Sequence, residues 1–158
     1  MTSNDDKELE RCYKRAIFHL GRRALSSFRL REKLSLHFSE HAIEQCIQVL
    51  QEKKYLDDKD YLFKKMESGK RKGKSSFVIL KKMEQEGYDL RSIKKDFEEI
   101  KTADSVEEDL ETLLNYLKSK KNKLLSDREK LYRHLAYKGH SYSTIEKIWQ
   151  KLTSEINH

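Results

Sequence analysis

Three acidic residues lie close enough in the sequence to hold a divalent cation. Asp57, Asp58 and Asp60 carry carboxylate oxygens, which are the ligands a nuclease uses for such an ion. We predict instead that they cap a helix, because acidic side chains accept backbone N–H bonds at a helix start and suit its positive dipole end. A nuclease centred on Asp57 stays an alternative that metal-dependent cleavage would reveal.

A second group combines histidine and cysteine. His37 and His41 are four residues apart and Cys46 follows five residues later, which is close to metal-ligand spacing. Ser39 is expected to begin a helix between the two histidines, so they do not share a helical face. We therefore predict no metal site and no cofactor. The GxxxxGK[ST], GxGxxG and HExxH patterns are also absent from the sequence, so we predict that the protein is not an enzyme.

Basic side chains are the remaining candidates for function. The formal net charge is +7, and eight basic residues accompany only Glu67 between Lys64 and Lys82. This excess favours acidic partners such as nucleic acid or acidic protein surfaces, although a charge run is also typical of a solvated helix face. The opposite charge dominates from Asp96 to Glu111, which we expect to repel a polyanion. The predicted contact residues are Arg22, Arg23, Arg29, Arg31, Lys64, Lys65, Lys70, Arg71, Lys72, Lys74, Lys81, Lys82, Lys120, Lys121 and Lys123.

The elements that carry these side chains follow a pattern of about 50 residues that recurs three times. Ser39, Asp89 and Ser141 are each expected to cap a helix, and apolar residues follow each of them at +4, +8 and +11. The pattern predicts an all-α protein with three tandem three-helix repeats, residues 1–54, 55–103 and 104–158, in an elongated, curved array. The inward-facing residues are Ile43, Ile47, Leu50, Ile93, Phe97, Ile100, Ile145, Trp149 and Leu152.

Two glycine patterns predict local structure. Gly87-Tyr88-Asp89 and Gly139-His140-Ser141 indicate equivalent turns, whereas His37-Phe38-Ser39 lacks the glycine and predicts a different turn. Gly69 and Gly73 bracket Lys70-Arg71-Lys72, which predicts a short exposed basic connection. Further helices are expected over about 7–20 and 28–38.

Composition supports this architecture and limits the location of the protein. The sequence has no proline, five glycines, 39% charged and 36% hydrophobic residues, which favours helices and several small cores over one large core. No apolar run is long enough for a membrane span, and the first residues lack the features of a signal peptide. We expect a cytoplasmic monomer without a membrane partner, in which Cys12 and Cys46 are semi-buried free thiols.

Several short motifs also resemble a known family. The segment from Tyr55 to Asp89 is similar to the central segment of the bacterial RecX family, through Tyr-Leu-Asp-Asp-Lys-Asp-Tyr, Lys72-Gly73, Ile79-Leu80 and Glu86-Gly87-Tyr88. Three shorter segments resemble the first repeat of this family: Ala24-Leu25-Ser26, Arg31-Glu32-Lys33-Leu34 and Ile43-Glu44.

This resemblance implies a non-enzymatic regulator of the RecA recombinase. Such a protein lodges in the groove of the RecA filament on single- or double-stranded DNA, inhibits RecA activities including ATP hydrolysis, and acts in DNA recombination, DNA repair and the SOS response. The alternative from the residues alone is an autonomous DNA-binding protein built of helical repeats. Dependence on RecA separates the two hypotheses.

Overall fold

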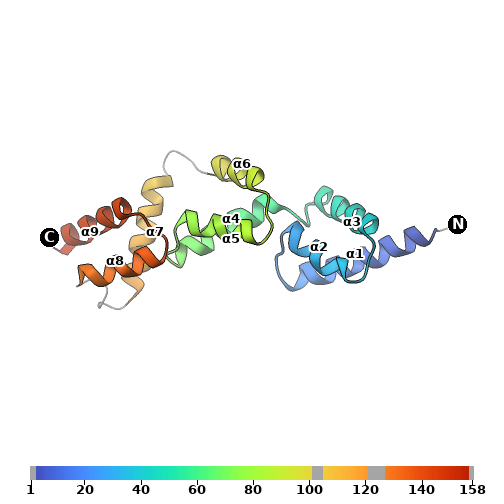
Figure 1. The fold of residues 1–158 in the computed structure, drawn as a ribbon, viewed down its shortest axis with the longest axis horizontal. Helices are drawn as coiled ribbons and strands as arrows, with labels where there is room; N and C mark the ends of the chain where they lie inside the picture. Colours follow the sequence, from blue (N-terminus) through green and yellow to red (C-terminus); the bar gives the residue numbers. More distant parts are fainter. Residues whose placement is uncertain (1–2, 101–104, 121–126, 157–158) are drawn as a thin grey trace.

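The computed structural model describes residues 3–100, 105–120 and 127–156, and this part of the chain folds into nine helices without a strand (Figure 1). The prediction of an all-α protein is confirmed. The helices are α1 (Asn4–Arg22), α2 (Ser27–Ser35), α3 (Glu40–Glu52), α4 (Asp58–Arg71), α5 (Ser76–Gln85), α6 (Leu90–Ile100), α7 (Ser105–Ser119), α8 (Arg128–Tyr137) and α9 (Tyr142–Ile156). None of them is both long enough and apolar enough to cross a membrane.

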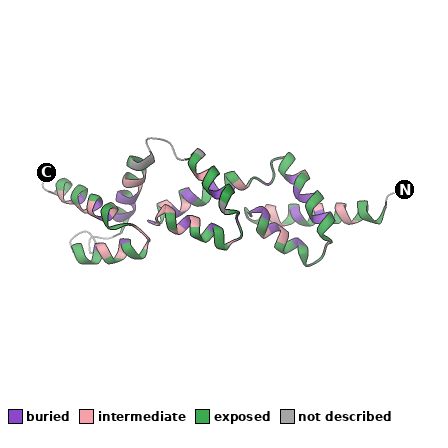
Figure 2. Ribbon diagram, turned by 45° about the horizontal axis from the view of Figure 1, so that its top comes forward, coloured by how far each residue is buried: buried purple, intermediate pink, exposed green. Residues whose placement is uncertain are grey.

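The helices form three groups along the long axis of the molecule, with the two termini at opposite ends (Figure 1). We call α1–α3 the first unit, α4–α6 the second unit and α7–α9 the third unit. Each unit has its own cluster of buried apolar residues, and Figure 2 shows these residues on the inward sides of the helices. Leu56 packs into the first cluster, although it follows the predicted boundary after residue 54. The boundaries of the repeats stay a prediction.

The last helix of each unit supplies the apolar stripe that its sequence predicts. Ile43, Ile47 and Leu50 are at most 4% exposed, and Ile93 is 1% exposed. Ile145 and Leu152 are equally well buried in the third unit. Phe97 and Trp149 are only partly buried, and each packs against the cluster of buried residues of its own unit. The side chain of Ile100 lies outside the described part of the chain.

Side-chain caps set where the helices begin. Ser3 and Asp6 form a reciprocal capping box, so α1 starts three residues before the expected position. Asp57 caps α4 by accepting a hydrogen bond of 3.0 Å from the backbone N–H of Asp60. Ser39 and Ser75 cap α3 and α5 in the same way. The predicted capping roles of Asp57 and Ser39 are therefore confirmed.

The turns after the second helix of each unit differ as the glycine pattern predicts. Gly87 and Gly139 both have φ of 92°, a left-handed conformation that a β-carbon disfavours. His37 in the first unit does not adopt a positive φ. Lys54 is the one described non-glycine residue that does, with φ of 59°, where it closes α3.

The expected basic connection at residues 70–72 is wrong for its first two residues. Gly69, Lys70 and Arg71 belong to α4, which ends at Arg71. Gly69 lies inside this helix because the side chain of Ile79 occupies the space that a β-carbon would need. Lys70 is held by an ion pair of 2.7 Å with Asp109 of α7. Both residues thus lie in packed parts of α4, where the glycine and the charge run predict a loop.

The first and second units meet at the first turn of α2. The backbone N–H of Ser27, in the first turn of α2, donates a hydrogen bond of 2.8 Å to the carboxylate of Asp58. Gly87, in the turn after α5, lies directly against the ring of Phe28 in the same turn of α2. The turn of the second unit therefore sits on the start of the second helix of the first unit.

A comparable arrangement joins the second and third units. Gly139, in the turn after α8, lies against Ser75 and Val78 at the start of α5. The backbone N–H of Ser75 donates to the carbonyl of Lys138 at 3.0 Å. His140 Nε2 lies 2.7 Å from the carbonyl oxygen of Gly73, and α7 packs beside α4. Both joints thus place a glycine turn on the first turn of the preceding unit's second helix.

Candidate functional site

The joint between the second and third units gathers lysines from separate elements. Lys65 lies on α4, Lys72 and Lys74 lie between α4 and α5, Lys82 lies on α5, and Lys138 caps the end of α8. We call these residues the joint lysine cluster. Lys65, Lys72, Lys74 and Lys82 belong to the set predicted from the sequence, whereas Lys138 does not.

The electrostatics of Lys74 show that the other four lysines act on it. Partial burial lowers the pKa of the Lys74 ammonium, and the charges of Lys82, Lys72, Lys138 and Lys65 lower it further. Like charges disfavour one another's ionised form, so this direction indicates that cations surround Lys74. An anion at this site would relieve that repulsion.

None of the five lysines forms an ion pair with a carboxylate within the described residues. Lys65 and Lys138 instead lie over aromatic rings, 5.3 Å from the ring centre of Tyr61 and 5.7 Å from that of Tyr116. Such contacts hold the long side chains near the surface and leave the ammonium groups accessible. The cluster therefore presents uncompensated positive charge.

Local packing fixes the backbone under the cluster. Gly73 separates Lys72 from Lys74 and lies against the ring of Tyr116 from α7. The hydroxyl of Tyr116 lies 2.8 Å from Nε2 of His134, whose ring stacks on that of Tyr116. This aromatic contact places the turn between α4 and α5 against α7, so that lysines of both units lie at one joint.

A cavity of about 520 Å³ opens at the same joint. Its walls combine apolar residues such as Leu80 and Leu113 with Lys74, and they include the first residues of α5 and α9. Lys70 and Asp109 also face this cavity, but their ion pair neutralises both. Lys74 is thus the cationic group of the cavity wall that has no carboxylate partner among the described residues.

The other predicted residues of the second and third units are more dispersed. Lys64 pairs with Asp60 at 2.9 Å, and Lys81 lies 5.9 Å from the ring centre of Phe77. Arg71 is exposed. Lys120 lies 5.6 Å from the ring centre of Tyr116 and so adjoins the joint lysine cluster. Lys121 and Lys123 lie outside the described residues.

The predicted residues of the first unit divide into paired and unpaired arginines. Arg29 pairs with Glu32 at 2.8 Å, and Arg31 makes two hydrogen bonds of 2.7 and 3.3 Å to the carboxylate of Glu44. Exposed pairs of this kind stabilise a fold only weakly, but they reduce the charge available to a partner. Arg22 and Arg23 are exposed and form no ion pair among the described residues.

Lys138 is the residue of the cluster that sequence reasoning missed. It lies in the third unit, 56 residues after Lys82, and no run of basic residues surrounds it. The signal that could have found it is its position directly before Gly139, because the equivalent turn in the second unit had been recognised at Gly87. Placing one unit's turn on the preceding unit would have brought Lys138 to Ser75.

The acidic group has structural partners in place of a metal ion. Asp57 caps α4, Asp58 accepts hydrogen bonds from the backbone and the hydroxyl of Ser27, and Asp60 pairs with Lys64. Within the described residues, no three His, Cys, Asp or Glu side chains come together in a way that could hold a metal ion.

The cysteines are more deeply buried than expected. Cys12 and Cys46 are both 0% exposed in the first core and are free thiols. Burial, followed by the influence of Cys46, raises the pKa of the Cys12 thiol to about 12. A buried thiol with such a pKa stays protonated at neutral pH and is a poor nucleophile.

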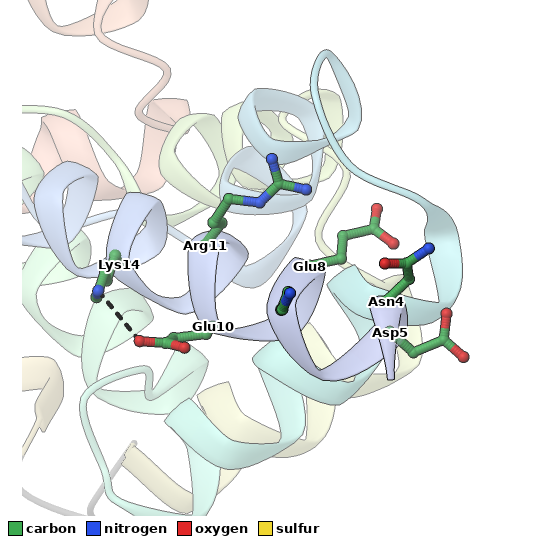
Figure 3. Close-up of a pocket in the computed structure, with 7 residues that line it drawn as sticks. Asn4, Asp5, Glu8, Glu10, Arg11 and Lys14 are labelled. Atoms are coloured by element: carbon green, nitrogen blue, oxygen red, sulfur yellow. Dashed lines mark ion pairs between the residues drawn. The ribbon is translucent and has the colours of Figure 1, made fainter. Parts of the chain in front are cut away.

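A second concave surface lies along the exposed side of α1 near its start (Figure 3). Its lining mixes acids with bases, and Glu10 pairs with Lys14 at 3.1 Å. Glu8 is also engaged, because it accepts a hydrogen bond of 2.7 Å from the backbone N–H of Ser39. With balanced charge and no apolar wall, this surface has no feature that would select an anionic partner.

The fold and the site together define a class of protein: an elongated all-α array of small helical units with a basic joint. No family model matches the sequence. The chain is 30% identical over 142 residues to "Regulatory protein RecX" of Clostridium botulinum strain Eklund 17B and to the protein of that name in strain Alaska E43. In both cases the alignment covers 87% of this chain and 66% of the relative.

Two solved structures share the fold. The crystal structure of RecX from Lactobacillus salivarius aligns with a TM-score of 0.73 and 23% identity, over 93% of this chain and 97% of that one. A second structure, described as regulatory protein RecX, aligns with a TM-score of 0.66 and 18% identity, over 91% of this chain and 72% of that one. The chain belongs to the RecX family.

Proposed function

We propose that this protein is a non-enzymatic regulator of RecA that binds in the groove of the RecA–DNA filament and inhibits its activities. Membership of a family of regulatory proteins supports this function, as does the elongated array, which suits a partner with a long repeated surface. In this proposal the protein modulates recombination, ATP hydrolysis and SOS-related activities in the cytoplasm. Its partners are RecA and single- or double-stranded DNA, and it acts as a monomer.

The observation that carries the proposal is the joint lysine cluster. Five lysines from two units share one region without carboxylate partners among the described residues, and their repulsion is visible in the lowered pKa of Lys74. A filament groove offers DNA phosphates and acidic side chains of RecA, and either would neutralise this charge. Because the cluster crosses a joint, a ligand bound there would also hold the second and third units in one relative position.

Inhibition follows from the shape of the protein in this mechanism. An array that spans more than one RecA subunit along the groove links subunits that must move during ATP hydrolysis. Its presence also blocks access of other DNA to the groove. No covalent chemistry is required of the bound protein, so the proposal assigns no catalytic residue.

DNA-dependent ATP hydrolysis by RecA of the same organism tests the proposal. The native protein is titrated beside a variant with Lys72→Glu, Lys74→Glu and Lys138→Glu. A control with Lys94→Glu, Lys95→Glu and Lys151→Glu changes the net charge equally at exposed sites outside the cluster. We expect inhibition at near-stoichiometric concentrations by the native and control proteins and weaker inhibition by the cluster variant.

The joint lysine cluster also favours the second hypothesis, an autonomous DNA-binding protein. RecA dependence distinguishes the two functions. A filament regulator acts on RecA at concentrations that leave naked DNA mostly unbound, whereas an autonomous DNA-binding protein acts only when it saturates the DNA. No effect on RecA under saturating conditions would refute the regulator hypothesis.

A further inference from the structure

A second basic surface lies at the end of α1, away from the joint lysine cluster, and is built around an exposed aromatic ring. Phe18 is 49% exposed. The guanidinium carbon of Arg15 lies 5.0 Å from its ring centre and that of Arg22 lies 5.6 Å from it. Arg15 precedes Phe18 by three residues and Arg22 follows it by four, so helical spacing places the three side chains together on one side of α1.

The charge around this ring comes from two helices. Burial lowers the pKa of the neighbouring His19, and the charges of Arg15, Lys33, Arg22 and His37 lower it further. Lys33 and His37 come from α2 and the segment that follows it. We call Arg15, Phe18, His19, Arg22, Lys33 and His37 the first-unit patch.

The cations of the first-unit patch are available to a partner. Within the described part of the chain, Arg15, Arg22 and Lys33 form no ion pair. Their neighbours Arg29 and Arg31 differ in this respect, because each is paired with a glutamate. The first-unit patch therefore carries positive charge that no neighbouring carboxylate among the described residues neutralises.

Helix stabilisation explains only part of this arrangement. Basic residues in the last turn of a helix interact favourably with its negative dipole end, which accounts for Arg22 on α1 and Lys33 on α2. It does not account for Arg15, which lies two turns before the end of α1. It also does not account for an aromatic ring that is half exposed between two guanidinium groups.

We propose that the first-unit patch binds single-stranded nucleic acid, with a base stacked on Phe18 and the adjoining phosphates on Arg15, Arg22 and Lys33. An aromatic ring and a positively charged track are the two parts of such sites, because every unpaired base has a flat face and every linkage has a phosphate. Duplex nucleic acid satisfies only the second part, since its base faces are covered. An acidic protein surface would pair with the arginines but would not need an exposed aromatic ring.

This site goes beyond the proposed function because it assigns single-stranded nucleic acid to a surface of the first unit that the joint lysine cluster does not include. The first unit would hold a single strand while the joint lysine cluster, in the second and third units, contacts a different part of the same partner. Failure of one surface does not imply failure of the other, because the two share no residue.

The test is fluorescence anisotropy of the full chain with a labelled thymidine oligonucleotide and with an abasic oligomer of equal length. Phe18→Leu keeps an apolar side chain and removes the ring, so binding to the thymidine oligonucleotide should weaken about 10-fold while binding to the abasic oligomer stays unchanged. Arg15→Gln with Arg22→Gln should weaken both. Arg11→Gln with Lys14→Gln, on the same helix, is the charge-matched control and should change neither beyond about 2-fold.

Each outcome decides the proposal. Equal binding of the thymidine oligonucleotide by the native protein and the Phe18→Leu variant would overturn the stacking site, provided that helical circular dichroism shows both to be folded. Equally tight binding of polyglutamate, lost in the arginine variant, would overturn the assignment to nucleic acid and indicate an acidic protein partner. RecA inhibition is measured separately, so a negative result here leaves the regulator hypothesis to its own assay.

Discussion

The salt dependence of DNA binding gives a quantitative test of the joint lysine cluster. The change is Lys72→Gln, Lys74→Gln and Lys138→Gln, which removes three of its five free charges and leaves Lys65 and Lys82 in place. Each phosphate that a lysine neutralises on duplex DNA contributes about 0.9 to the slope of log affinity against log salt. If all five lysines contact phosphates, the native slope is about −4.5 and the variant slope about −1.8.

These slopes predict clearly different losses of affinity. Between about 50 and about 200 mM salt, the native protein should lose about 500-fold in affinity and the variant only about 12-fold. Fluorescence anisotropy with a labelled duplex measures both. A control with Lys94→Gln, Lys95→Gln and Lys151→Gln has the same net charge as the variant and should retain the native slope.

An unchanged slope in the cluster variant would refute the reasoning. It would mean that the five lysines, although four of them act on Lys74 at the joint, do not contact phosphates. A control variant that lost as much slope as the cluster variant would refute it differently, because binding would then depend on net charge and not on position.

Three further predictions concern stability and are measured by urea or thermal unfolding. Gly87→Ala should destabilise the fold by about 1 to 3 kcal/mol, because the new β-carbon meets the ring of Phe28 and φ of Gly87 is 92°. Adding Phe28→Ala to this variant should recover part of the lost stability. An unchanged stability of Gly87→Ala would contradict the described contact between Gly87 and Phe28. Burial lowers the pKa of His140. Below about pH 6.5 the unfolded state therefore binds a proton that the folded state does not. The free energy of unfolding should fall there by at most about 1.4 kcal/mol per pH unit. His140→Asn should lessen this acid sensitivity, and an identical pH profile would contradict it. Lys54→Gly should stabilise the protein by about 1 kcal/mol, because φ of 59° is unfavourable for lysine. Lys53→Gly is the control, because Lys53 has an ordinary negative φ, and this change should not stabilise the protein.

The features that sequence reasoning predicted correctly depend on residues close together in the chain. The cap at Ser39 and the stripe through Ile43 and Leu50 belong to a single helix, so spacing alone defines them. The turn at Gly139 likewise depends on its own backbone conformation. Local rules therefore predicted the helices, their buried faces and the difference between the turns.

The features that it missed depend on how the units are placed. Lys70 was expected in an exposed connection, but it lies on α4 and contacts Asp109, 39 residues later, at the joint. The acidic stretch was expected only to repel a polyanion, yet Asp109 within it stabilises the contact with the second unit. Lys138 joined the lysine cluster at the same joint, where its carbonyl accepts a hydrogen bond from the backbone N–H of Ser75. Charge runs along the sequence do not show which unit a side chain will face.

The two joints also bear on self-association. In each joint a glycine turn of one unit sits on the first turn of another unit's second helix, so the two surfaces in contact are different. Such head-to-tail contacts can propagate into open polymers when a molecule exposes both surfaces. Two features of the chain differ from these joints. The turn at His37 has no left-handed residue, and α8 begins with the exposed charges of Arg128, Glu129 and Lys130, whereas α2 places Phe28 against the glycine turn. The turn at His37 and the start of α8 are therefore poorly matched for a contact of this kind between two molecules.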